Sequence, residues 1–114
     1  MSNHAQQLQA EMAELNRRNQ ELRSVLLRFE ETCSRLAQLV GDGESMSEGL
    51  ESVRGSLQRR DVNEATEQFD TARHRVRVAM FALALDQGTS RSEMGRALGI
   101  SRQLASRLAA EIED

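Results

Sequence analysis

The sequence predicts an all-α protein with a long N-terminal helix, a helical connector and two short C-terminal helices. Proline, the residue that interrupts helices most strongly, is absent from all 114 residues. Aromatic residues make up 3% of the chain, so its core must be built mainly from leucine, valine, alanine and methionine, as in many helical proteins. Apolar residues recur at intervals of three and four along most of the chain, and no segment shows the alternation of a strand.

The first segment, about residues 4–40, carries the clearest repeat. Its a and d positions fit five heptads without a slip, a pattern that predicts a coiled coil. Asn19 occupies one a position, where asparagine commonly fixes register and favours two parallel strands. We therefore expect this helix to pair with that of a second copy. The candidate dimerisation residues are Leu8, Met12, Leu15, Asn19, Leu22, Leu26, Phe29, Cys33 and Leu36.

Two features of this helix argue against a simple parallel dimer. Arg18 at a g position would face Arg23 at an e position of the second copy, which is a like-charge contact. Val25, Leu27 and Leu39 widen the apolar stripe in the second half, and a wider stripe favours more than one neighbour. The second half should therefore also pack on other helices of its own chain. A self-contained bundle is the alternative to pairing between chains, and the direction of pairing stays open.

A helical connector follows the first segment. A glycine-rich turn at residues 41–45 ends the long helix. Ser45 and Glu48 have the spacing of a capping box and predict the start of a short second helix. The regular three- and four-residue spacing of apolar residues is then interrupted, which predicts a tight turn at residues 59–61. A third helix is expected over about residues 62–87.

The C-terminal segment predicts two short helices joined by a glycine turn. Ser90 and Glu93 form a second capping-box pattern that opens the first helix. Gly95 is expected where the two helices cross, and Gly99 at the turn, where a positive φ angle is needed. Ser101 should then cap the second helix. The residues expected to point inward are Met94, Leu98, Ile100 and Leu108.

This segment, about residues 73–112, resembles the homeodomain-like, three-helix helix-turn-helix domains of bacterial transcription regulators. The resemblance rests on Met94, Gly95, Leu98, Gly99, Ile100, Ser101, Arg102, Gln103, Ala105 and Leu108. Gly95 departs from the usual alanine, and Ala105 from a larger branched residue. The resemblance implies a recognition helix at about residues 101–111 that enters the major groove of DNA. An ordinary helical hairpin with a glycine turn is the alternative.

On this basis we expect a coiled-coil dimerisation region at residues 1–60 and a helix-turn-helix DNA-binding domain at residues 61–114. The charge distribution agrees, because residues 73–110 contain seven arginines and two acidic residues, a net charge of +5, whereas the remaining residues together carry −8. Arg102 and Gln103 have forked groups that match guanine and adenine edges. The candidate DNA-binding residues are Thr89, Ser90, Arg91, Ser101, Arg102, Gln103, Ser106 and Arg107.

We therefore expect a sequence-specific DNA-binding protein, in particular a dimeric bacterial transcriptional regulator. Its expected partners are double-stranded DNA and a second copy of the chain. One alternative is an adaptor that binds another protein through the coiled coil. Another is an architectural protein of DNA partition or packaging that assembles beyond a dimer. The operator sequence and the direction of regulation stay open.

Other chemistry is not indicated. His4 and His74 lie far apart in sequence and belong to no Cys/His cluster, so no metal site is expected. Cys33 is the only cysteine, which excludes an intrachain disulfide and favours a reducing compartment. At an a position it should be a small core residue. No catalytic arrangement or phosphate-binding loop occurs, so we expect no enzymatic activity and no cofactor. With no apolar segment of signal-peptide or membrane-span length, we expect a cytoplasmic, nucleoid-associated protein without membrane contact.

Overall fold

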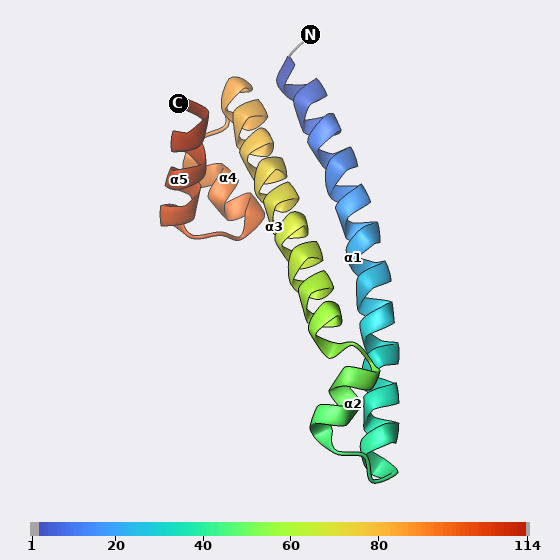
Figure 1. Cartoon of the computed structure of the whole chain (residues 1–114). Coiled ribbons are helices and arrows are strands. Elements are labelled where there is room, and N and C mark those ends of the chain that lie inside the picture. Colours follow the sequence, from blue (N-terminus) through green and yellow to red (C-terminus); the bar gives the residue numbers. More distant parts are fainter. Residues whose placement is uncertain (1–2, 114) are drawn as a thin grey trace. The chain divides into compact units, whose positions relative to one another are not determined.

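The computed structural model describes residues 3–113, which form five helices (Figure 1). The helices are α1 (Asn3–Gly41), α2 (Met46–Ser52), α3 (Gly55–Asp86), α4 (Arg91–Leu98) and α5 (Arg102–Glu113). No strand occurs in this range, so the predicted all-α class with a long N-terminal helix is confirmed. None of the described helices is both long enough and apolar enough to cross a bilayer.

The chain consists of two compact units. The terminal unit combines Met1–Asn16 with Thr71–Asp114, and the central unit is Arg17–Asp70. The two long helices, α1 and α3, contribute to both units. The domain boundary expected after residue 60 lies inside α3.

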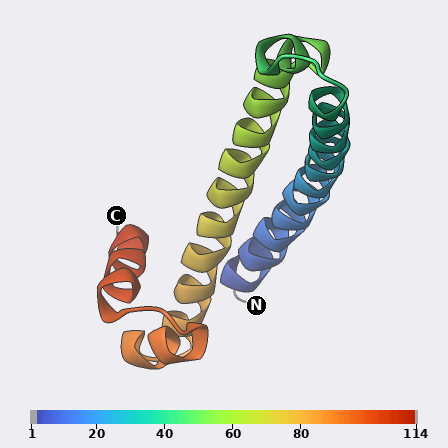
Figure 2. The same cartoon turned by 90° about the horizontal axis from the view of Figure 1, so that it is seen from below.

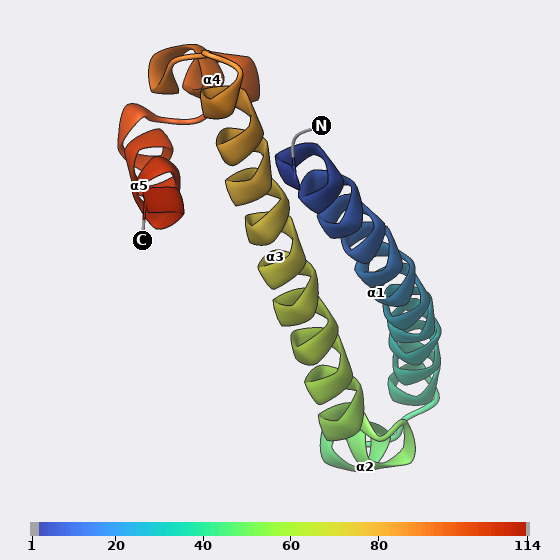
Figure 3. The ribbon, with the colours of Figure 1, turned by 90° about the horizontal axis from the view of Figure 1, so that it is seen from above.

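In the central unit, the parts of α1 and α3 lie side by side and α2 joins them (Figures 1 and 3). Arg18 of α1 donates hydrogen bonds to Glu21 of its own helix at 3.1 Å and to the Oε1 of Gln68 in α3 at 3.2 Å. α2 packs on the end of α1, since a Cβ atom built on Gly49 would lie 2.9 Å from the Cδ1 of Leu36. The expectation that the second half of the long helix packs on its own chain is therefore confirmed.

This packing covers one stripe of α1 and leaves another open. No residue of α1 is fully buried. Among the candidate dimerisation residues, those partly buried within the chain are Leu8, Leu15, Leu22 and Leu36. Those exposed are Met12, Asn19, Leu26, Phe29 and Cys33. Cys33 is thus not a core residue of the single chain, and pairing of α1 with a second copy stays a prediction.

The predicted start of α2 is confirmed, but the predicted turn after it is wrong. The Oγ of Ser45 accepts the N–H of Glu48 at 3.3 Å and caps α2. Residues 59–61, however, are helical because α3 already begins at Gly55. The chain turns instead directly after α2, where Arg54 adopts a φ of 55°.

The terminal unit carries the main apolar core. At its centre are Phe81 of α3 and Leu108 and Ala109 of α5, all 0–1% exposed, together with Ala105. α4 and α5 lie beside the end of α3 (Figure 2). The partly buried residues around the core are Val78, Leu85, Met94, Leu98, Ile100, Leu104 and Ile112. The predicted inward positions of α4 and α5 are therefore confirmed.

Candidate nucleic-acid interface

α4 and α5 are bounded by the residues that the sequence indicates. The Oγ of Ser90 accepts the N–H of Glu93 at 3.1 Å, and the Oε1 of Glu93 accepts the N–H of Ser90 at 3.4 Å, which completes the capping box. Gly99 ends α4 with φ 69° and ψ 33°, the left-handed conformation that glycine adopts without a Cβ penalty. The Oγ of Ser101 accepts the N–H of Leu104 at 3.1 Å and caps α5.

Small residues allow α4 and α5 to approach closely. Gly95 is buried, and a Cβ atom built on it would lie 3.4 Å from the Cβ of Ala105 and 3.8 Å from the carbonyl oxygen of Ile100. These are ordinary van der Waals distances, so the site has room for a methyl group but not for a longer side chain. The predicted crossing at Gly95 is confirmed.

α5 has two faces of different character. Its inner face holds Ala105, Leu108 and Ala109 in the core. Its outer face presents four exposed polar or basic side chains at the i, i+1, i+4, i+5 spacing of one helix face. These side chains are Arg102, Gln103, Ser106 and Arg107. Because the inner face is fixed by packing, the direction of the outer face is fixed as well.

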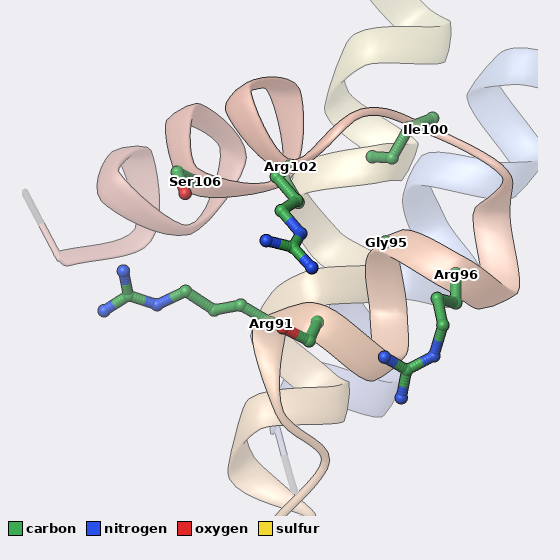
Figure 4. Close-up of a pocket in the computed structure, with 8 residues that line it drawn as sticks. Arg91, Gly95, Arg96, Ile100, Arg102 and Ser106 are labelled. Carbon is green, nitrogen blue, oxygen red and sulfur yellow. The ribbon is translucent and has the colours of Figure 1, made fainter.

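A groove of about 280 Å³ runs between α4 and α5 (Figure 4). The side chain of Arg102 extends from the start of α5 into the space beside α4, and that of Arg91 extends from the start of α4 toward the side of α5 (Figure 4). Arg96 lies further along α4. The lining residues are Arg91, Ser92, Gly95, Arg96, Ile100, Arg102, Ala105 and Ser106. Three guanidinium groups and no carboxylate therefore line this groove.

A second, shallower hollow lies on the outer face of α5 and is lined by Arg102, Gln103, Ser106 and Arg107. Arg102 belongs to both hollows. Within residues 3–112, no carboxylate forms an ion pair with Arg96, Arg102 or Arg107. Their positive charge is thus directed to the solvent, where it can attract anions such as phosphate groups.

The remaining predicted DNA-binding residues have structural roles. Thr89 is partly buried, and its N–H donates to the carbonyl of Ala84 at 2.9 Å at the end of α3. Ser90 belongs to the capping box, and the Glu93 carboxylate beside it opposes binding of an anion at the start of α4. Ser101 caps α5 but is exposed. Contact of any of these residues with DNA stays a prediction.

One groove residue, Arg96, was not predicted from the sequence. Its i, i+4 spacing to Ser92 on α4 was an available signal, because residues four apart share one helix face. The position of Arg96 became evident only once Gly95 and Ala105 had placed this face beside α5.

Elsewhere, the exposed His74 lies 2.9 Å from the Oε2 of Glu111 and links α3 with α5. Within the described part of the chain, no three His, Cys, Asp or Glu residues gather in an arrangement that could hold a metal ion. No protein-family model matches the chain, and no curated protein or solved structure matches it.

Proposed function

We propose that the chain binds double-stranded DNA through a helix-turn-helix made by the end of α3, α4 and α5. One observation carries the proposal: the outer face of α5 presents Arg102, Gln103, Ser106 and Arg107 together, with no carboxylate among the lining residues of either hollow. Arginine and glutamine are the side chains that pair with guanine and adenine edges in the major groove.

The groove beside α4 fits the backbone of the same duplex. Phosphate contacts fix the position of a DNA-binding helix, whereas base contacts give sequence preference. Arg91 and Arg96 on α4 are suited to phosphate groups, because guanidinium forks match phosphate oxygens. Gln103 and Arg107 lie only on the outer face of α5. We assign base contacts to this outer face, with Arg102 at the junction of the two regions.

The resemblance of residues 73–112 to regulator domains supports a specific role for this binding. We propose that the protein is a sequence-specific transcriptional regulator, with α5 as its recognition helix. The glycine turn at Gly99 and the close approach of α4 and α5 at Gly95 support this proposal, because a helix-turn-helix joins its two helices through a short turn that often contains glycine.

Replacing Arg102 with alanine tests this assignment. We expect binding to a preferred duplex, selected from random sequences, to weaken by about 1–3 kcal/mol, with relaxed base preference at one position. Fluorescence anisotropy with the preferred and a scrambled duplex measures both effects. The matched control is Arg59→Ala, since Arg59 is an exposed arginine of the central unit.

Equal losses on the preferred and the scrambled duplex would place Arg102 on a phosphate instead of a base. Affinities equal to those of the parent on both duplexes would remove Arg102 from the interface and contradict the proposed function.

A further inference from the structure

The central unit has a thin core beside an exposed apolar surface. Within residues 17–70, all of them described, only Val53 and Ala65 are buried among the apolar side chains. In the middle of α1, Leu26, Leu27 and Phe29 remain 42%, 61% and 39% exposed. Leu26 and Phe29 are three residues apart and therefore adjoin on one face of the helix, and adjoining exposed apolar side chains mark an interaction site.

The chain itself covers the opposite flank of this helix. The g positions Arg18, Val25, Thr32 and Leu39 are all partly buried, and Arg18 is hydrogen-bonded to Gln68 of α3. The e positions Arg23 and Glu30 are exposed, and so are the neighbouring a positions Leu26 and Cys33. The a and e side of α1 is therefore open to a further helix in this region.

The charges on this open side of α1 attract those of a second copy only when the two helices run antiparallel. Arg23 precedes Leu26 by three residues and Glu30 follows it by four, and no described residue forms an ion pair with either. Against a parallel copy in register, an e position faces a g position, so Arg23 would face Arg18 and Glu30 would face Val25, and no favourable pair forms. Against an antiparallel copy, each Arg23 faces a Glu30, and the favourable pair forms twice.

We propose that α1 binds α1 of a second copy in antiparallel orientation, with the two-fold axis between Leu26 and Phe29. Leu26 of one copy then packs on Phe29 of the other, and the same contact repeats by symmetry. The exposed side chains of Leu26 and Phe29 become covered. This inference concerns α1 alone and does not depend on DNA binding.

Cys33 distinguishes the two directions of pairing. It lies about 5.5 residues from the proposed axis, so the two copies of Cys33 are about 16 Å apart along the helices at 1.5 Å per residue. A disulfide requires Cα atoms within about 7 Å. In a parallel pair in register, the two Cys33 residues would lie side by side and could be joined.

Sedimentation equilibrium of the full chain tests the proposal. We expect a species of twice the 12.8 kDa chain mass. Arg23→Glu and Glu30→Arg should each weaken the dimer on the order of tenfold, since two ion pairs become two repulsive contacts, and the double exchange should restore it. Leu26→Glu should dissociate the dimer, whereas Met46→Glu, the same change at a 57% exposed residue outside this surface, should not. Circular dichroism verifies that each variant stays helical.

A monomer at all concentrations would overturn the proposal. A dimer that Arg23→Glu leaves unchanged or tightens, and that mild oxidation links through Cys33, would show parallel pairing and overturn the antiparallel arrangement. A dimer insensitive to Leu26→Glu would place the interface elsewhere and overturn it as well.

Discussion

Replacing Phe81 with alanine is expected to lower the free energy of unfolding by about 3–5 kcal/mol, the cost of removing a large buried aromatic side chain and leaving a cavity. Phe81 is 0% exposed and lies in one cluster with Ala105, Leu108 and Ala109 of α5. The alanine residues in this cluster are too small to fill the space. Because small domains are stable by only about 5–15 kcal/mol, we expect α4 and α5 to lose their fixed packing on α3.

Urea unfolding followed by circular dichroism measures this loss, and hydrogen exchange locates it in the terminal unit. Met46→Ala is the control, since it truncates a large apolar side chain that is 57% exposed and lies outside the proposed α1 interface. The control should cost less, because less apolar area is removed from a packed site. Equal costs for the two variants would mean that Phe81 is not the centre of the core.

Replacing Gly99 with valine is expected to reduce DNA binding more than it reduces stability. Gly99 has φ 69° and ψ 33°, where a β-branched side chain is strongly disfavoured, so the strain should cost about 1–3 kcal/mol. Relief of that strain changes the angle between α4 and α5. The angle decides whether Arg102 of α5 and Arg91 of α4 can meet the same duplex, so affinity falls beyond the loss of stability.

A thermal melt and a DNA titration on the same Gly99→Val sample separate the two effects. Gly99→Asn provides the comparison, because asparagine tolerates the left-handed conformation better than other residues with a side chain. It should retain most of the binding that valine removes. A valine variant that binds DNA like the parent would show that the turn geometry does not serve DNA binding.

The local features of the C-terminal segment could be predicted from the sequence because each depends on a few neighbouring residues. The capping box needs only Ser90 and Glu93, and the turn needs a glycine at position 99. The close approach at Gly95 was also predictable, since a small residue in a short amphipathic helix indicates a crossing. Such signals hold whatever the rest of the chain does.

The turn after α2 could not be predicted in this way. The left-handed residue there is Arg54, which has a Cβ atom, and the glycine follows it. Gly55 has little space for a side chain, since a Cβ atom on it would lie 3.0 Å from the Cδ2 of Leu50. Because Gly55 lies beside the turn and not at its left-handed position, it did not indicate a turn. The interrupted spacing of apolar residues predicted a turn at residues 59–61 instead, and that prediction is wrong.

The role of Phe81 was missed because α3 serves two neighbours. In the sequence, apolar residues spaced by three and four along the third helix include Val76 and Met80 but not Phe81. In the terminal unit, one side of α3 holds Ala72 and Val76 in the core, and Phe81 faces α5. A single apolar stripe of helical spacing identifies only one buried face of a helix. The second buried face of α3, which includes Phe81, was identified only from its packing on α5.

The heptads of α1 show the same limit. They predict an apolar stripe but not which chain covers it. Partly buried Leu22 and Leu36 pack within the central unit, whereas Leu26 and Phe29 stay exposed. One stripe can thus serve packing inside the chain at some positions and contact with a second copy at others.

Titration of a random-sequence DNA duplex with the full chain over a range of salt concentrations tests the central claim most directly. If Arg91, Arg96, Arg102 and Arg107 each neutralise one phosphate, the logarithm of the association constant should fall with that of the salt concentration with a slope of about −3 to −4 per chain. Absence of binding at low salt, or binding that does not weaken as salt rises, would contradict a DNA-binding interface on α4 and α5.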